Sequence, residues 1–382
     1  MEKLLNNRTG LIIKQQSGYD AFMPKKLSEE EVNLNIDAEM LRILSEADRA
    51  LGELKGVTET LPNPNLFIAF YVQKEAILSS QIEGTQCSLD EILQVDQRKF
   101  EIKPVTEVVN YIKAMDEGLN ELKDFPMNIR LLKKIHKILL QNVRGKERTP
   151  GEFKKQQNWV GPAGCNLNEA IYIPPPPDMM IELMGDWEVY YHKESKYVHL
   201  IKAAIMHSHF ETIHPFIDGN GRLGRLLITF MLCEKKVLNK PILYLSLFFK
   251  ENKTEYYQML MDVRFKGTWE EWIKFFLRGI RNTSKEAIQT AKDILSLQQK
   301  HTALIKETLS KYRIVLSLFN LICKNPIISI PFACKELDVS YPTVKKTIDA
   351  LISKGILVKY NDMKRKKLFV YSNYLDILKR GT

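Results

Sequence analysis

The residues best suited to chemistry lie together in one short stretch, residues 214–225, which reads HPFIDGNGRLGR. It holds an imidazole, a carboxylate, three glycines, an asparagine amide and two guanidinium groups. Glycines let a backbone approach an anion closely and turn its N–H groups toward it, and arginines three residues apart can converge on one polyanion. His214 could act as a base beside them. We therefore expect an active-site loop for the phosphates of a nucleotide.

Two helices must position this loop. The apolar run Leu226–Leu232 predicts a helix whose N-terminus carries the loop glycines and presents unpaired N–H donors. Upstream, Leu200, Ala203, His207 and Phe210 recur at three- and four-residue steps, which predicts a buried helix over residues 197–213.

Other readings of the same stretch have to be considered. Residues 219–224 fit G-x-G-x-x-G, but no βαβ alternation surrounds them, and no Gly-Lys followed by Ser or Thr closes a P-loop. His207, His209 and His214 are close enough in sequence to suggest a transition-metal site. No acidic partner stands at a suitable spacing, and His207 fits the apolar stripe, so a core role is favoured.

Two upstream stretches also stand out. A helix is expected from Leu66 to about Ile82 and ends near Gly84, with Glu83 as a carboxylate at its end. Residues 151–177 predict a β-hairpin with a long turn, which the run Pro174–Pro177 ends. A lone hairpin among helices has little sheet to bury it, so we expect a flap rather than core.

Composition separates a tail from the rest of the chain. The chain has 382 residues and a net charge of +10, and residues 300–382 hold 16 Lys and Arg against 6 Asp and Glu. The remainder is neutral, so the basicity belongs to the tail. No apolar run approaches the length of a membrane span, and five scattered cysteines predict reduced thiols in a cytoplasmic protein without a membrane partner.

The tail predicts a winged helix-turn-helix domain. Its third helix, Pro342–Lys354, is expected to expose Thr343, Lys345, Lys346 and Thr347, and a basic turn at 361–366 joins two strands. Such a domain can bind DNA or serve as a protein or dimer contact, and the sequence leaves both open.

The loop resembles the signature of the Fic family, proteins that transfer AMP from ATP to protein hydroxyls. The match over 214–225 is complete, Ser79-x-x-x-Glu83-Gly84 is similar to the family's inhibitory motif, and the flap resembles its target-clamping hairpin. The resemblance covers about residues 30–280 and implies a mainly α, Fic-type helical bundle core with a β-hairpin flap, followed by the winged helix-turn-helix domain. The expected organisation has four parts: an N-terminal helical region (1–110), a catalytic core (111–282), a connecting helix (283–309) and the tail domain (310–382). The N-terminal region contains the inhibitory helix (about 66–84). The catalytic core contains the flap (about 151–177) and the nucleotide loop (214–225).

The resemblance also implies roles for single residues. His214 is the general base, Asp218 is the Mg²⁺ ligand, and Arg225 holds the γ-phosphate unless Glu83 removes it. The remaining nucleotide-binding candidates are Gly219, Asn220, Gly221, Arg222, Leu223, Gly224, Asn252, Tyr256 and Tyr257. The remaining inhibitory and flap candidates are Ser79, Gly84, Ile171, Tyr172 and Ile173.

The implied activity is a magnesium-dependent protein adenylyltransferase that Glu83 autoinhibits. It uses ATP and modifies Ser, Thr or Tyr on an unidentified target, which could be the chain itself. Two alternatives stay open: a DNA-binding regulator with a ligand-sensing core, and an enzyme that removes AMP from a modified protein. The sequence does not decide whether the chain forms a homodimer.

Overall fold

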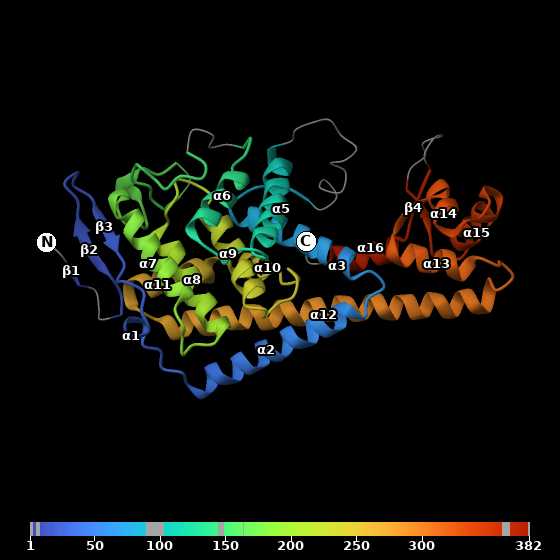
Figure 1. Ribbon diagram of the computed structural model, residues 1–382, viewed down its shortest axis with the longest axis horizontal. Helices are drawn as coiled ribbons and strands as arrows, with labels where there is room; N and C mark the ends of the chain where they lie inside the picture. The colour runs from blue at the N-terminus through green and yellow to red at the C-terminus, as the bar shows by residue number, and fades with distance from the viewer. Residues whose placement is uncertain are drawn as a thin grey trace. The chain divides into compact units, whose positions relative to one another are not determined.

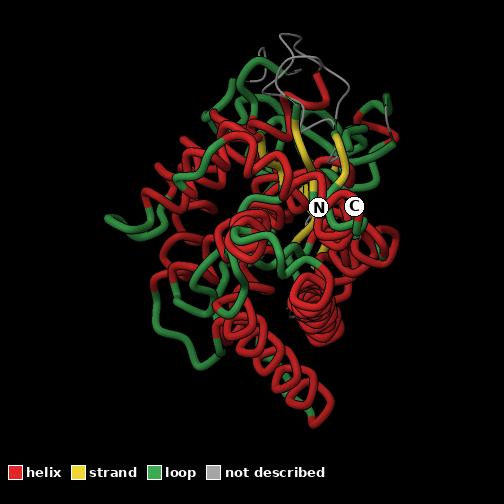
Figure 2. Tube along the Cα trace, turned by 90° about the vertical axis from the view of Figure 1, so that its right-hand side faces the viewer, coloured by secondary structure: helices red, strands yellow, loops and turns green. Residues whose placement is uncertain are grey.

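The computed structural model describes residues 3–4, 8–88, 103–143, 149–162, 164–360 and 367–380 (Figure 1). Helices dominate, and two small antiparallel sheets accompany them (Figure 2). The described helices are α1 (Glu29–Val32), α2 (Ala38–Glu59), α3 (Pro64–Ile82), α5 (Lys103–Glu121), α6 (Ile129–Leu139), α7 (Met180–His192), α8 (His199–Ile213), α9 (Asn220–Glu234), α10 (Ser246–Glu251), α11 (Lys253–Lys266), α12 (Trp269–Thr308), α13 (Val315–Lys324), α14 (Ile330–Leu337), α15 (Tyr341–Ser353) and α16 (Ser372–Lys379). The described strands are β1 (Lys3–Leu4), β2 (Leu11–Lys14), β3 (Asp20–Met23), β4 (Ile327–Ser329), β5 (Val358–Lys359) and β6 (Leu368–Val370). The mainly helical fold is therefore confirmed. No helix in these ranges is both long and apolar enough for a membrane span.

The chain divides into two compact units. The first comprises Met1–Leu51 and Tyr71–Ser284, and the second comprises Gly52–Phe70 and Lys285–Thr382. Residues 214–225 lie in the first unit and the basic tail lies in the second.

Helices α8 and α9 form the centre of the first unit. Every residue of α8 from Leu200 to Ile213 is buried, and so is every residue of α9 from Arg222 to Leu232. A helix that is covered on all sides belongs to a core, and its polar residues then need internal partners. The loop that joins these two helices is held between rigid elements.

An aromatic cluster closes one side of this core. The ring of Phe249 from α10 stacks on Tyr256 from α11 with centroids 4.4 Å apart, and Trp272 from α12 lies 5.9 Å from His207. Such rings bury large areas with defined geometry, which fixes α10, α11 and α12 against α8.

Residues up to about Leu27 are polar and without a regular pattern, which predicts a loosely packed lead-in to the N-terminal helical region, but they form a sheet. Strands β1, β2 and β3 form an antiparallel sheet in sequence order, with Leu11 opposite Met23. Gly18 allows the turn with φ +92°, and Phe22 is buried. The strands are too short to show a clear alternation in the sequence.

The flap differs from a regular hairpin. Its only described pairing is one antiparallel bridge between Val160 and Tyr172, and a 3₁₀ turn over Leu167–Glu169 stands between them. In place of the expected β-hairpin, the described part of the segment therefore has a single β-bridge. The glycines, prolines and asparagines of this segment favour turns over a ladder.

The second unit contains the expected winged helix-turn-helix. α13, α14 and α15 follow in order, and a sheet with strand order β4-β6-β5 packs beside them. The sequence reading missed β4, which pairs Ile328 with Phe369, and the last helix α16. Thr347 is buried and donates to the carbonyl of Thr343, so it is not on the exposed face as expected. The basic turn at 361–366 lies outside the described residues.

The helix that leads into the basic tail is longer than expected. α12 runs without a break from Trp269 to Thr308, whereas the connecting helix was expected to begin at residue 283. The stretch has no proline, and its glycine, Gly279, stays within the helix, which explains the continuity.

A glycine pair tests the packing of α5 against α9. A Cβ built on Gly118 would lie 2.2 Å from the buried ring of Phe230, whereas a Cβ on Gly185 of α7 meets nothing within 4 Å. We expect Gly118→Ala to lower the free energy of unfolding by about 1–3 kcal/mol through overpacking, and Gly185→Ala to raise it by up to about 1 kcal/mol through helix propensity. Chemical denaturation of both variants checks this, and equal shifts would contradict the close α5–α9 contact.

Candidate active site

Asn220 builds the shape of the loop. Its carboxamide accepts from the N–H of Phe216 at 2.9 Å and donates to the carbonyl of the same residue at 2.8 Å. Asn158 from the flap also donates to the Phe216 carbonyl at 2.7 Å. Because Asn220 is buried and both ends of its amide are used, its side chain holds the loop rather than facing a ligand.

His136 is a second support, and the sequence reading missed it. Its Nδ1 accepts from the Gly151 N–H at 2.8 Å, so Nε2 carries the proton and donates to the Asp218 carbonyl at 2.9 Å. Its ring stacks on Phe216 with centroids 3.8 Å apart. Burial lowers the pKa of His136 to about 4, which keeps this tautomer neutral. A histidine on the buried face of α6 was the available signal.

His214 caps α8 and turns the chain out of the helix. Its backbone has φ +50°, and its N–H donates to the carbonyl of Phe210 at 2.9 Å. Burial, with the neighbouring charges of Lys154 and Arg264, lowers the pKa of His214 to about 3. A neutral imidazole at ordinary pH can accept a proton, as the base role requires.

Glu211 lies on the preceding turn of α8. Its Oε2 is 3.9 Å from Nδ1 of His214, and burial raises its pKa to about 7. A Cβ on Gly224 would come within 2.3 Å of Glu211 Oε1, so this glycine is required for close packing of α9 on α8. The Gly224 carbonyl also bonds His207 Nδ1 at 3.0 Å. Gly224 and the fully buried Leu223 therefore contact the protein core, where we had expected both to bind nucleotide.

Arg225 connects the loop helix to α3. Its Nε donates to Ser79 Oγ at 2.8 Å and its Nη2 donates to the Ser79 carbonyl at 2.9 Å. The same Nη2 pairs with Glu83 Oε1 at 2.7 Å, and only 2% of the Arg225 side chain is exposed. The structure thus brings together Ser79, Glu83 and Arg225 as the motif suggested, while Gly84 ends the helix with φ +90°.

Arg222 meets a carboxylate that the sequence reading did not select. Its Nη1 lies 3.5 Å from Oε2 of Glu107 on α5, and its Nη2 lies 3.9 Å from Oδ1 of Asp218. The same Glu107 oxygen accepts from the Thr85 hydroxyl at 2.5 Å. Glu107 carried no motif signal, because its partners are separated from it by 22 and 115 residues.

Asp218 suits a magnesium ion. Its Oδ1 accepts from the Gly219 N–H at 2.7 Å, and the side chain is about one-third exposed. Mg²⁺ prefers such a carboxylate together with water and phosphate oxygens. Beside it, a Cβ on Gly221 would lie 2.3 Å from Glu83 Oε1, so the lack of a side chain at Gly221 lets the Glu83 carboxylate approach the helix N-terminus.

The residues expected to contact the adenine ring differ in their burial. Tyr256 is fully buried, and its hydroxyl bonds Nε2 of His207 at 2.9 Å, so its ring is not open to a nucleotide. Both ring nitrogens of His207 are thereby used within the protein. Tyr257 is 38% exposed, and Asn252 donates to the Phe248 carbonyl as it begins α11. Of the two tyrosines, Tyr257 is therefore the one whose ring is exposed enough to stack on an adenine.

Of the flap residues, Ile171 faces solvent and Tyr172 packs into the protein. Ile171 is 61% exposed, but Tyr172 is buried, with its hydroxyl on the Thr212 carbonyl and Arg264 4.1 Å above its ring. The Ile173 carbonyl accepts from the Phe22 N–H of β3 at 2.9 Å. A target strand therefore finds part of this backbone already paired.

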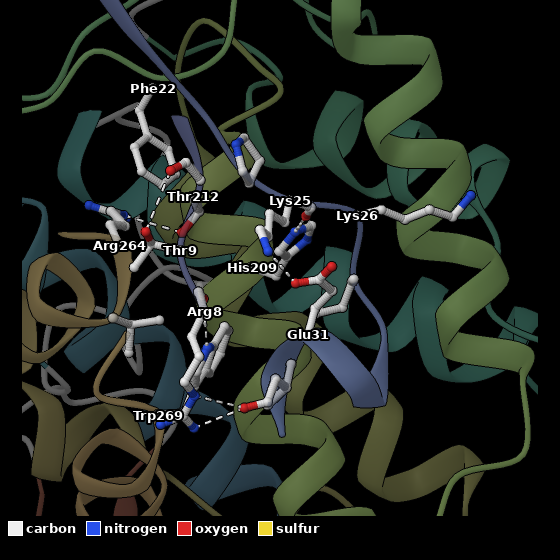
Figure 3. Close-up of a pocket in the computed structure, with 15 residues that line it drawn as sticks. Arg8, Thr9, Phe22, Lys25, Lys26, Glu31, His209, Thr212, Arg264 and Trp269 are labelled. Carbon is white, nitrogen blue, oxygen red and sulfur yellow. Dashed lines mark hydrogen bonds and ion pairs between the residues drawn. The ribbon is translucent and has the colours of Figure 1, made fainter. Parts of the chain in front are cut away.

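A separate cavity lies on another side of α8 (Figure 3). Side chains of Arg8, Phe22, His209 and Trp269 line it together with the Thr212–Arg264 pair, in which Arg264 donates to the Thr212 hydroxyl at 3.2 Å. Its volume of about 40 Å³ suits a few water molecules and not a nucleotide. The nucleotide loop does not contribute to its lining.

Comparisons with known proteins identify the family to which the chain is similar. Residues 126–232 match the Fic/DOC family, and residues 41–120 match the Fic/DOC family N-terminal region. A probable protein adenylyltransferase from Aquifex aeolicus is 26% identical over 45% of the chain and 51% of its own length. Protein adenylyltransferase Fic from Culex quinquefasciatus is 28% identical over 53% of the chain and 40% of its own length. The chain thus spans about half the length of these relatives. The crystal structure of a Fic family protein from Desulfovibrio desulfuricans G20 superposes with a TM-score of 0.60 at 18% identity and covers 88% of this chain and 97% of that chain, which shows a shared fold.

The buried histidines predict how stability depends on pH. Burial lowers the pKa values of His136 and His209 to about 4 and those of His207 and His214 to about 3. Below pH 6.5 the unfolded chain binds protons that the folded chain does not, so stability should fall by about 1.4 kcal/mol per pH unit for each histidine. The pKa of Glu211 is raised to about 7, so between pH 4.5 and 7 its protonation in the folded chain offsets the loss of stability from one histidine.

The variant His209→Gln isolates one of these groups. Between pH 6.5 and 5 we expect its free energy of unfolding to fall less steeply than that of the wild type, by one proton. At pH 8 to 9 the two slopes should agree, because the histidines are neutral in both states. Parallel curves across the whole range in chemical denaturation would contradict the assignment.

Proposed function

The chain belongs to the Fic/DOC family, and on this premise we propose that it is a protein adenylyltransferase that transfers AMP from ATP to Ser, Thr or Tyr hydroxyls. The observation that carries the proposal is a neutral His214 at the entry of a loop whose helix starts with a glycine cradle and two guanidinium groups. The names of the relatives support the same activity.

In the proposed reaction, the acceptor oxygen bonds to the α-phosphorus of ATP while the bond to the α,β-bridging oxygen breaks and pyrophosphate leaves. His214 accepts the hydroxyl proton, which makes the oxygen nucleophilic. Backbone N–H groups at the start of α9 and the guanidinium of Arg222 stabilise negative charge on the phosphates. Asp218 would hold Mg²⁺, which neutralises phosphate charge when bound.

Glu83 makes the resting state inactive in this proposal. Its carboxylate pairs with Arg225 at 2.7 Å and places negative charge where the γ-phosphate would bind. ATP could then bind only with its α-phosphate turned away from the line of attack, so transfer would be slow.

The first test is Glu83→Gly. The substitution releases Arg225, so we expect incorporation of label from α-³²P-ATP into the chain or an added protein to rise at least tenfold. Glu117→Gln, on the surface of α5, is the matched control and should behave as the wild type. Equal labelling in all three proteins would overturn the inhibitory role.

The second test is His214→Ala in the Glu83→Gly background. Removal of the base should lower labelling by 10² or more, while the affinity for Mg-ATP, measured by calorimetry, stays nearly unchanged because the phosphate cradle is intact. Labelling that persists at the original rate would exclude His214 as the base.

A second activity, DNA binding by the tail, is favoured by the surface of α15. Lys345 and Lys346 are exposed beside Thr343, and the same face borders an open groove with Tyr312 and Pro342. Lysines on an exposed helix contact phosphates, and such binding weakens steeply with salt. The double variant Lys345→Glu, Lys346→Glu should abolish a salt-dependent shift of duplex DNA. Absence of any shift for the wild type at low salt would exclude this activity.

A further inference from the structure

Glu107 occupies a junction between the end of α3 and the phosphate loop. Its Oε2 accepts from the Thr85 hydroxyl at 2.5 Å and lies 3.5 Å from Arg222 Nη1. Thr85 directly follows Glu83 and Gly84. One oxygen atom therefore contacts both the segment that carries the inhibitory carboxylate and the first arginine of the loop.

The described residues satisfy the hydrogen-bond donors of Arg222 only in part. Its side chain is only 7% exposed, and among the described residues its Nε has no hydrogen-bond partner. The other carboxylate nearby, Asp218, is 3.9 Å away. A buried guanidinium of this kind needs a close anion, and Glu107 at 3.5 Å compensates it only in part. A phosphate could accept hydrogen bonds from the guanidinium donors of Arg222 that the protein leaves unsatisfied.

Hydrogen bonds from several segments hold the end of α3, including those that Gln81 makes with the Cys87 carbonyl and with Lys250. Past Glu83 the helix ends with Gly84 in the left-handed region, and the Thr85 N–H returns to the Ser80 carbonyl at 3.1 Å. The Thr85 side chain adds the bond to Glu107, and Lys253 donates to the Ile82 carbonyl at 2.6 Å. A charge-assisted bond at a helix end is worth enough to decide whether that end stays docked.

We propose that Glu107 is a second inhibitory carboxylate, which withholds Arg222 from the nucleotide phosphates and, through Thr85, keeps the end of α3 docked so that Glu83 stays on Arg225. This inference rests on the proposed AMP transfer and its inhibition by Glu83. Glu107 touches no reacting atom, so it is a positioning residue. Both arginines of the loop are then held by carboxylates from outside the loop, one on α5 and one at the end of α3.

Two substitutions separate the two parts of this role. Thr85→Val removes the bond to the end of α3 and leaves the charge on Glu107, so it acts only through Glu83. Glu107→Gln removes the charge and also frees Arg222. Matched controls are Thr60→Val, at the end of α2, whose hydroxyl donates to the Val57 carbonyl, and Glu117→Gln on α5.

The first measurement is label transfer from α-³²P-ATP by the full chain. Thr85→Val should raise transfer about tenfold, the effect of losing one hydrogen bond to a charged group, and should add nothing in the Glu83→Gly background. The controls should stay at the wild-type rate. No increase for Thr85→Val, or an equal increase with and without Glu83, would overturn the coupling to α3.

The second measurement is Mg-ATP affinity by calorimetry in the His214→Ala background, where transfer does not consume the nucleotide. Glu107→Gln should tighten binding about three- to tenfold, because Arg222 is freed for phosphate. Weaker or unchanged binding would mean that Glu107 does not withhold Arg222, and would overturn that part of the inference.

A third measurement is independent of AMP transfer. Without nucleotide, the amides of Glu83, Gly84 and Thr85 should exchange hydrogen faster in Thr85→Val than in Thr60→Val, because the end of α3 undocks more often. If no variant transfers AMP but these amides exchange faster, the proposed function fails while the docking by Glu107 holds. If exchange is unchanged, the docking itself is refuted.

Discussion

Arg225 carries a positive charge that ordinary pH does not remove, and its side chain is 2% exposed. A buried guanidinium without partners costs several kcal/mol, so the protein must surround it with acceptors. Ser79 provides two and Glu83 provides the anion. The position of α3 against α9 follows from this requirement. A ligand anion that replaced Glu83 would satisfy the same requirement, so the proposed inhibition and the proposed phosphate binding would use the same guanidinium group.

Hydrogen bonds within the protein shape the loop beside Arg225. The Asn220 amide closes it on Phe216, and His136 holds the carbonyl of Asp218 from α6. These bonds use up side chains that could otherwise have faced a ligand and leave backbone N–H groups at the start of α9 for that purpose. Charge stabilisation by fixed dipoles requires little reorganisation during a reaction.

The sequence predicted the parts of this protein that depend on local patterns. The order histidine, aspartate, glycines and arginines gave the loop, and helical periodicity gave α8 and α9 around it. What it did not predict depends on contacts between distant segments. Glu107 and His136 show no motif, since their importance comes from Thr85, Arg222 and Asp218 far along the chain. Burial also decided between equivalent candidates: Tyr256 entered the core while its neighbour Tyr257 kept an exposed ring.

The contact between β3 and the flap has a further consequence. Within the flap, the N–H groups of Ile171 and Tyr172 donate to the Val160 carbonyl, and the Tyr172 carbonyl accepts from the Val160 N–H. Exposed strand edges with unpaired groups promote association between molecules. The Phe22 N–H covers the Ile173 carbonyl at 2.9 Å and so shields part of that edge within the chain itself. The N-terminal sheet thus covers a backbone acceptor of the flap that an exposed edge would offer to another molecule.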